Sequence, residues 1–429
     1  MRPEKTWDEL DADSLALTEI SLILDDAFGI RLPDVDPADM RTVGDALALV
    51  ERAVAERGRL RREQADLSFE AASRARRSGS RTECSACSYA RRVRSNQLRR
   101  PKRRVAIAGL VVALSACSSD GPPPRTDVPE PAVSPVPSEA PAGRVVPLAG
   151  QPEGLVVDGP TRTIAAGVRN PDGLALVDVD TGVERTRRPF AGSPRHLQLA
   201  RPGGPVLVPA EGTDRLYQVA LPDGALVGDV GVCRQPHDAT PAGSRTFVGD
   251  ELEDRVSVVE GDRRVQQLPA PVMPGGVAAA LDGSVVVAVG VRGREIEAYR
   301  PDGTSLGRTR CGVGPTHVRA GPGGRFYVTD TQGEALLVFE VGPDGPRQVA
   351  KVAAEGAPYG LAIDATRSIA YVTLTASNRV QAFRLDGTTP KADRSWPTLR
   401  QPNDVGVDPS TGRIVVAGAT DSALQLIDP

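Results

Sequence analysis

The sequence of 429 residues contains only five cysteines, which are Cys84, Cys87, Cys117, Cys233 and Cys311. They are too few and too scattered for a fold that disulfide bonds hold together, so apolar burial must form the core. We expect Cys233 and Cys311 to remain unpaired. The formal net charge of −3 is also small, and this balance gives no indication of a nucleic acid partner.

The sequence lacks an apolar run long enough to span a membrane, and it lacks two common enzyme motifs. The apolar run from Val105 to Ala113 is too short to cross a bilayer, which takes about 20 residues. The chain contains no Walker phosphate loop and no His-Glu-x-x-His zinc motif. These absences argue against a stable transmembrane helix and against those two kinds of catalytic site.

Composition changes along the chain and divides it into five segments. Residues 57–98 are rich in arginine and serine and have almost no apolar periodicity, which predicts disorder. The prediction for the whole chain is a helical fragment (1–56), this basic disordered segment (57–98), a lipoprotein signal (99–117), a proline-rich tether (118–143) and an all-β propeller (144–429).

Apolar residues recur at helical spacing near the amino end, and Asp13 and Ser14 occupy the expected helix start. The motif Asp13-Ser14-Leu15, with Phe28-Gly29-Ile30 and Thr42-Val43-Gly44-Asp45-Ala46 after it, resembles acyl and peptidyl carrier proteins. The resemblance implies 4′-phosphopantetheine on Ser14. The alternative is a fragment of a neighbouring gene that a misplaced start joins to this one.

Residues 99–117 combine a basic stretch, the short apolar run and small residues, an order typical of a secretory signal. The end of this segment, Leu114-Ser115-Ala116-Cys117, resembles a bacterial lipobox. The resemblance implies cleavage before Cys117 and a lipid on its thiol. We therefore expect the mature protein to be anchored to the outer face of the cell membrane through Cys117.

The position of this signal, almost a hundred residues into the chain, suggests a second start of translation near Val93. Prolines then recur every few residues between 121 and 143, which predicts extended chain that separates the next domain from the membrane. Cleavage at Cys117 would in either case remove the carrier-like segment from the mature propeller.

The remaining sequence repeats with a period near 40 residues. Seven prolines, at intervals of 38 to 44 residues, mark the repeats: Pro152, Pro194, Pro236, Pro274, Pro315, Pro358 and Pro402. Several short alternating apolar runs follow each proline, a pattern typical of propeller blades. The seventh repeat ends after three strands, so residues 144–148 are expected to supply its fourth strand and close the ring.

The repeats resemble the NHL and YVTN classes of propeller, for example in Pro358-Tyr-Gly-Leu-Ala-Ile-Asp364. This resemblance covers about two thirds of the chain. It specifies the architecture but not the activity, because function depends on sites that the fold carries.

The chain has three histidines, His196, His237 and His317, and each lies one or two residues after a repeat proline. In a propeller this position faces the mouth of the central channel. Equivalent positions also hold Glu153, Arg195, Asp238, Tyr359, Asn403 and Asp404. Imidazoles and carboxylates there could bind a polar ligand or protein partner, ligate a divalent metal, or serve as acid and base, and the alternative is hydrogen bonding to loop backbone.

One enzyme family offers a second interpretation. The segments around His196 and His317, with Val208 to Arg215, resemble repeats of seven-bladed lactonases related to 6-phosphogluconolactonase. This resemblance implies lactone hydrolysis with a histidine and Glu211 near the site. Three hypotheses follow: an anchored, non-catalytic binding protein, which we favour; a lactonase or lyase that uses His196, His237 or His317; and a carrier that acts through Ser14.

Overall fold

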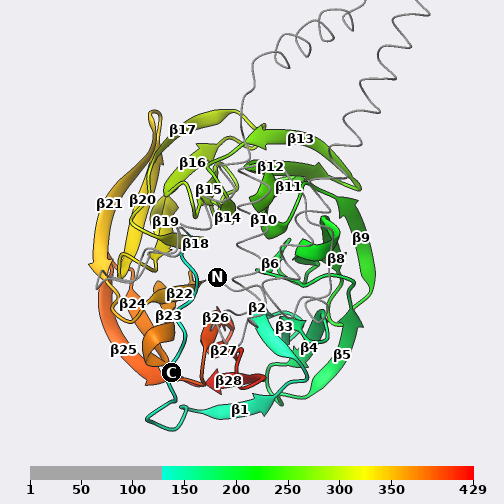
Figure 1. Cartoon of the computed structure of the whole chain (residues 1–429), viewed down its shortest axis with the longest axis vertical. Coiled ribbons are helices and arrows are strands. Elements are labelled where there is room, and N and C mark those ends of the chain that lie inside the picture. The colour runs from blue at the N-terminus through cyan, green and yellow to red at the C-terminus, as the bar shows by residue number, and fades with distance from the viewer. Residues whose placement is uncertain (1–127) are drawn as a thin grey trace, which may run out of the picture. The chain divides into compact units, whose positions relative to one another are not determined.

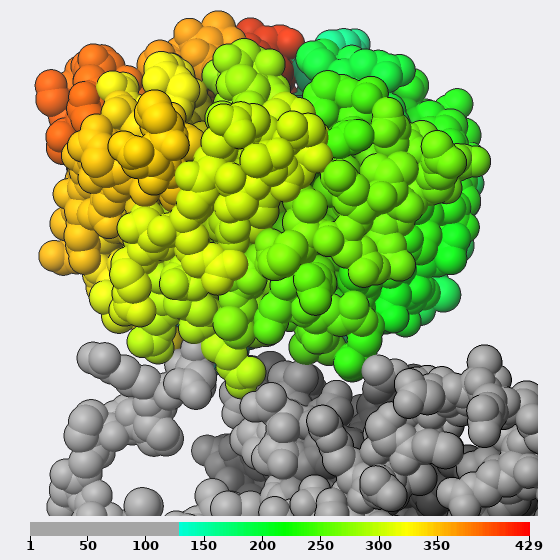
Figure 2. Space-filling model, turned by 90° about the horizontal axis from the view of Figure 1, so that it is seen from above, coloured from blue at the N-terminus to red at the C-terminus, as the bar shows by residue number. Residues whose placement is uncertain are grey.

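The computed structural model describes residues 128–429, which form the predicted seven-bladed β-propeller (Figure 1). Seven four-stranded antiparallel sheets surround one axis, and each repeat proline lies at the entry to an innermost strand. Figure 2 views the ring from its edge, where neighbouring blades form a continuous surface. The prediction of an all-β, seven-bladed fold is therefore confirmed.

Within each blade the strands run from the axis outward. The first three blades contain β2 (Gln151–Asp158), β3 (Thr163–Arg169), β4 (Gly173–Asp178), β5 (Glu184–Pro189); β6 (Gln198–Leu199), β7 (Val206–Ala210), β8 (Arg215–Val219), β9 (Leu226–Gly231); β10 (Pro236–Ala242), β11 (Arg245–Asp250), β12 (Arg255–Glu260) and β13 (Arg263–Pro269). The fourth and fifth blades contain β14 (Pro274–Ala279), β15 (Val286–Gly290), β16 (Glu295–Tyr299), β17 (Ser305–Arg310); β18 (Pro315–Gly321), β19 (Arg325–Asp330), β20 (Ala335–Gly342) and β21 (Gly345–Ala353). The sixth and seventh contain β22 (Pro358–Asp364), β23 (Ile369–Leu374), β24 (Arg379–Arg384), β25 (Lys391–Pro397); β26 (Pro402–Val407), β27 (Ile414–Gly418), β28 (Ala423–Ile427) and β1 (Arg144–Pro147). Four short 3₁₀ turns join second to third strands or first to second strands: η3 (Glu211–Thr213), η4 (Glu251–Glu253), η5 (Pro322–Gly324) and η6 (Thr375–Ser377).

The two ends of the propeller meet in the seventh blade. Strand β1 pairs antiparallel with β28, in a register that places Arg144 opposite Leu426 and Pro147 opposite Ala423. Val146 is buried with apolar residues of the first and seventh blades. This pairing confirms the predicted closure by residues 144–148 and leaves β28 without a free edge.

Most of the core lies between neighbouring blades. The second and third strands have buried residues on both faces, because each blade packs face to face against the next. The cluster between the second and third blades, for example, joins Leu207 and Leu216 to Val248 and Val259. The inner strands are thereby fixed in position around the axis.

A local distortion directs the first residues of the inner strands. In six of the seven blades the pairing of the inner strand shifts register just after the repeat proline, as between Pro236 and Asp238. Such a bulge bends a strand and changes the direction of the side chains beside it. The inner strands of all seven blades begin at the same end of the ring, which we call the mouth. Side chains from several blades therefore lie near one another at this end.

Residues 128–143 form a strap that lies on the propeller and carries the second half of the predicted tether (Figure 1, cyan). The backbone NH of Ala132 donates to Thr375 Oγ1 at 3.1 Å, and that of Ser134 donates to Gln401 Oε1 at 2.9 Å. Ser134 Oγ also donates to the Thr375 carbonyl at 2.6 Å. The sequence predicted a tether here but did not indicate that this half of it binds the sixth and seventh blades.

Several predictions fall outside the described residues. They concern the carrier-like segment with Ser14, the basic segment with Cys84 and Cys87, and the signal with Cys117. Within residues 128–429, no helix is long and apolar enough to cross a bilayer.

Candidate functional site

The three histidines come from the second, third and fifth blades and meet at the axis. His196 Nε2 lies 2.7 Å from His317 Nε2, and the two ring centroids are 4.0 Å apart. The ring of His237 packs edge-on against His196, with a centroid distance of 4.7 Å. All three side chains are buried.

Hydrogen bonds determine where the protons lie on these rings. His317 Nδ1 must donate to the Tyr359 carbonyl oxygen, 2.8 Å away, because a carbonyl only accepts. In a neutral ring its Nε2 then accepts, so His196 Nε2 is the donor between the two rings. This leaves a lone pair on His196 Nδ1, for which the described residues provide no hydrogen-bond partner.

Burial lowers the pKa of each of the three histidines. The pKa of His317 falls to about 3, and those of His196 and His237 lie well below the usual value. Nearby histidines and Arg195 lower them further. All three rings are therefore neutral at physiological pH.

His196 and His317 were predicted as metal ligands together with His237, but their spacing does not suit a shared metal ion. Nitrogen ligands on a tetrahedral metal lie about 3.3 Å apart, given bonds of about 2.0–2.1 Å. The observed 2.7 Å is a hydrogen-bond distance. These two Nε2 atoms are therefore hydrogen-bonded to each other and do not share a metal ion.

The mouth holds a second group of ionisable residues, which we call the mouth cluster: Glu130, Glu153, Arg169, Arg195, Glu211, His237 and Glu251. Glu211 and Glu251 each begin a 3₁₀ turn, η3 and η4, that follows the second strand of its blade. Arg195 Nε lies 2.8 Å from Glu211 Oε1, and the Arg169 guanidinium lies 3.3 Å from Glu211 Oε2. Glu211, which the lactonase resemblance placed near the site, is thus held in ion pairs with two arginines.

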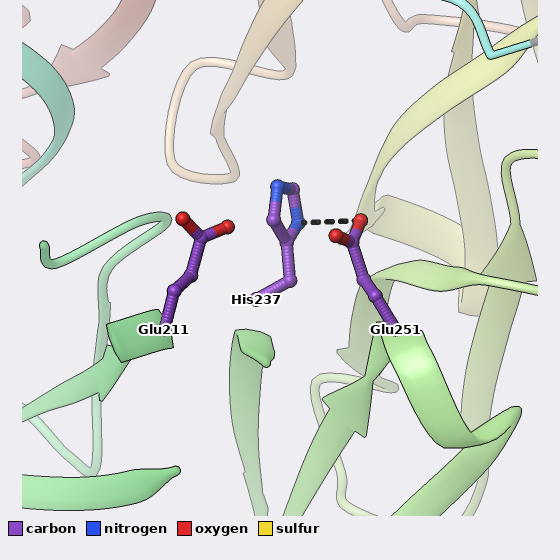
Figure 3. Close-up of side chains that lie close together, drawn as sticks. All are labelled: Glu211, His237 and Glu251. Carbon is purple, nitrogen blue, oxygen red and sulfur yellow. Dashed lines mark ion pairs between the residues drawn. The ribbon is translucent and has the colours of Figure 1, made fainter. Parts of the chain in front are cut away.

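Three members of this cluster have ligand atoms close together. One ring nitrogen of His237 and one carboxylate oxygen each from Glu211 and Glu251 lie within 4.8 Å of one another. Figure 3 shows the imidazole standing between the two carboxylates, with the Glu251 oxygen 3.7 Å from His237 Nδ1. This is the one group of three possible metal-ligating side chains within the described residues.

The acidic residues of the cluster resist ionisation. Burial raises the pKa of Glu251 to about 8, and the Glu211 carboxylate raises it further while Arg195 opposes the shift. Desolvation likewise raises the pKa of Glu130, and Arg195 opposes this shift, although Glu130 is an exposed residue. Glu251 is therefore mostly protonated at neutral pH in the structure as it stands.

Asp238 and Asp404 were predicted to bind a ligand, and the structure gives both of them internal partners. Asp238 pairs with Arg319 at 2.9 Å and accepts a hydrogen bond from Gln198 at 2.9 Å. Asp404 accepts the backbone NH of Leu155 at 2.8 Å, across the joint between the last and first blades. Burial raises the pKa of both carboxyls, that of Asp404 to about 7.

The other two predicted ligand residues, Tyr359 and Asn403, also lie near the axis. The Tyr359 ring is buried against His317, with a centroid distance of 4.5 Å. Asn403 Nδ2 donates to Glu153 at 3.2 Å and its oxygen accepts from Gln401 at 3.1 Å. Asn403 therefore links the strap-binding Gln401 to the mouth cluster.

Sequence reasoning missed Glu251, Arg169 and Glu130. Arg169, Glu211 and Glu251 are 42 and 40 residues apart, so they occupy the same place in three successive blades. Aligning the repeats on the end of the second strand would have revealed this position. Glu130 had no such signal, because only the fold places the strap at the mouth.

Two other sequence features carry no chemistry in the structure. Gly303-Thr304-Ser305-Leu306-Gly307 fits the Gly-x-Ser-x-Gly pattern, but Ser305 begins the outer strand β17 and donates to Glu297 at 2.7 Å. A nucleophile elbow requires a turn from strand to helix, which is lacking here. Cys233 and Cys311 are free, as expected, and the structure shows that both are buried.

Comparison with known proteins separates the chain into two parts. No family model matches it. About 50 residues at the amino end match acyl carrier proteins: the meromycolate extension acyl carrier proteins of Mycolicibacterium aurum and Mycobacterium tuberculosis, each 45% identical over 51 residues, and the acyl carrier protein of Rhodococcus erythropolis, 45% identical over 49 residues. The match covers 11–12% of this chain and 53%, 44% and 54% of the three relatives, so the chain spans about half their length. Homology to carrier proteins implies 4′-phosphopantetheine on this segment.

Solved structures resemble the propeller. Hydrazine synthase of Kuenenia stuttgartiensis aligns with a TM-score of 0.57 and 16% identity, over 66% of this chain and 96% of that chain. The β-propeller domain of Cps50 (Swd1) from Myceliophteria thermophila aligns with a TM-score of 0.57 and 12% identity, over 67% and 99%. At such low identity the likeness concerns the fold alone, and membership of the NHL or YVTN class stays a prediction.

Proposed function

We propose that this chain, which joins a carrier-protein-like segment to a seven-bladed propeller, matures into an exported lipoprotein whose propeller binds a polar ligand at the mouth cluster. Cys117 carries the lipid, and the propeller lies on the outer face of the cell membrane. The protein acts by binding and not by catalysis, since its candidate base Glu211 is held by two arginines.

The observation that carries the proposal is the gathering of ionisable groups where the fold does not require them. Burying carboxyl groups against one another costs stability, and such sites are retained mainly where they have a function. Here Glu251 is 5% exposed, beside Glu211 and His237, at a place where other blades carry Val291, Thr331 or Ala419. The fold thus accepts uncharged residues at this position. We therefore infer that the acidic residues are present to bind a ligand.

The strap relates the mouth to the anchor. Its first described residues lie beside the mouth, where the backbone of Ala132 bonds to Thr375 and that of Ser134 to Gln401. Only ten residues, 118–127, separate the strap from Cys117, and eleven extended steps of the chain reach about 40 Å at most. A lipid on Cys117 would therefore keep the start of the strap within about 40 Å of the membrane surface.

Anchoring is tested by growing bacterial cells that express the chain with labelled palmitate and then separating the membranes. We expect label in the propeller and recovery of the protein with the membranes. The Cys117→Ala variant should lose the label, whereas Cys233→Ala should keep it. Label that persists in Cys117→Ala would contradict the proposal.

A carrier function is the second candidate, and the 45% identity to acyl carrier proteins favours it. It requires 4′-phosphopantetheine on Ser14 of a chain that still contains the first 54 residues. Incubation of the full chain with coenzyme A and a phosphopantetheinyl transferase should then add the group to Ser14. The Ser14→Ala variant should stay unmodified. An unmodified wild-type chain would eliminate this candidate.

A further inference from the structure

We propose that Glu211, His237 and Glu251 form a binding site for a divalent first-row transition-metal ion. The inference deepens the proposed function, on which it rests, by naming the ligand of the mouth cluster. It replaces the histidine set that the sequence indicated with one histidine and two carboxylates from the second and third blades.

The first argument is charge balance. The named members of the mouth cluster include four carboxylates (Glu130, Glu153, Glu211, Glu251) and two guanidinium groups (Arg169, Arg195), a formal charge of −2 when all are ionised. The neutral histidines add no positive charge. A divalent cation bound beside these carboxylates would neutralise this formal charge.

The second argument is the tautomer of His237. Its Nδ1 lies 2.6 Å from the Gly275 carbonyl oxygen and must donate to it, which leaves the lone pair on Nε2. A metal-binding histidine commonly makes this contact, because the backbone carbonyl orients the ring and increases its basicity. The nitrogen on the Glu251 side of the ring is this same Nδ1, 3.7 Å from the carboxylate (Figure 3), so the two carboxylates must move toward Nε2 to share an ion with it.

The third argument is the space that Gly275 leaves. A Cβ atom at this position would lie 2.9 Å from Glu251 Oε1 and 3.5 Å from His237 Nδ1. Any side chain there would displace the carboxylate from the imidazole. The absence of a Cβ thus lets the third and fourth blades bring the two ligands together.

The donor set indicates the kind of metal. One imidazole with two carboxylates suits Mn²⁺, Fe²⁺ or Zn²⁺, whereas Ca²⁺ prefers oxygen ligands alone. Ligand atoms around such an ion lie about 3–4 Å apart, so the present separation of up to 4.8 Å must shrink by roughly an ångström. The glutamate side chains have the rotatable bonds for this movement, and Glu211 would exchange part of its contact with Arg195 for the metal.

The test is calorimetric titration of the purified full chain with Mn²⁺, which thiolates bind poorly, so that the five cysteines do not contribute. We expect one site in the wild type and at least about tenfold weaker binding in Glu251→Gln and His237→Gln. The matched control is Glu253→Gln, because Glu253 lies in the same turn η4 but is exposed. It should bind like the wild type.

Equal Mn²⁺ affinity in Glu251→Gln and wild type would overturn the site, and so would a wild type that binds neither Mn²⁺ nor Zn²⁺. Melting curves of each variant ensure that weak binding does not reflect unfolding. Palmitate labelling at Cys117 is read separately, so a failed metal titration with a labelled membrane protein rejects the metal and retains the anchored propeller.

Discussion

Glu251 is a carboxyl group whose ionisation the fold opposes. It is buried beside Glu211, and its Oε2 accepts only a long hydrogen bond, 3.3 Å, from Gln235 among the contacts in the described residues. An unfolded chain would ionise this group near its ordinary pKa of about 4.3. Folding therefore takes up a proton at neutral pH, at a cost in stability.

The change Glu251→Gln removes this cost, and we expect it to raise the free energy of unfolding by about 1–3 kcal/mol at pH 7 in the absence of metal. The folded pKa, about 8, lies above the unfolded value, so the wild type binds more protons when folded and loses stability as pH rises from about 4.5 to 8. Urea unfolding at several pH values measures both effects. A less stable variant with an unchanged pH slope would show that the carboxylate has a structural role.

Glycines beside the axis allow neighbouring blades to approach. At Gly154 a Cβ atom would lie 2.0 Å from the Arg195 carbonyl oxygen, which belongs to the next blade. Gly154→Ala should therefore push the first two blades apart and destabilise the propeller by about 1–3 kcal/mol. Gly342→Ala is the control, because its Cβ would meet nothing within 4 Å, and equal melting temperatures for the two variants would contradict this account.

The sequence indicated part of the site because the repeat prolines allow the seven blades to be aligned with one another. Histidines one or two residues after a proline had to share one end of the ring, and His196, His237 and His317 do meet there. The sequence could not show that His196 and His317 bond to each other, since a 2.7 Å contact between opposite sides of the ring depends on its diameter. It also could not show the internal partners of Asp238 and Asp404, which depend on how neighbouring blades stack.

Strand β1 is the element that holds the ring closed. Val146 is 8% exposed and packs in the core between the seventh and first blades, whereas its neighbour Val145 is 40% exposed. Val146→Asp would bury a charge without a partner, so we expect a loss of at least about 3 kcal/mol and a lower melting temperature for the whole propeller. Val145→Asp should change little, and equally small effects of both substitutions would contradict closure through β1.

The strap depends on a few polar contacts. The Gln401 side chain donates to the Ala132 carbonyl and accepts from the Ser134 NH, both at 2.9 Å. Gln401→Ala removes both bonds, each worth about 1 kcal/mol, and should speed hydrogen exchange in residues 128–143 while the inner strands stay protected. Gln348→Ala, on the exposed face of β21, serves as the control. Unchanged exchange in the strap would mean that other contacts hold it.

At the scale of the molecule, the number of blades and their closure could be predicted because both follow from a repeat with a period near 40 residues. The course of residues 128–143 could not, because proline-rich sequence specifies extended chain but not the surface that it binds. Under the proposed anchoring at Cys117, the strap would bring the lipid-bearing part of the chain toward the mouth cluster.

The carrier function and the lipoprotein function require different processing of the amino-terminal segment. A carrier must keep Ser14, whereas a lipoprotein loses everything before Cys117. The intact mass of the protein extracted from membranes distinguishes the two. We predict a chain that begins at Cys117 and carries lipid on that residue. A membrane-extracted chain that retains residues 1–116, without lipid on Cys117, would contradict the central claim.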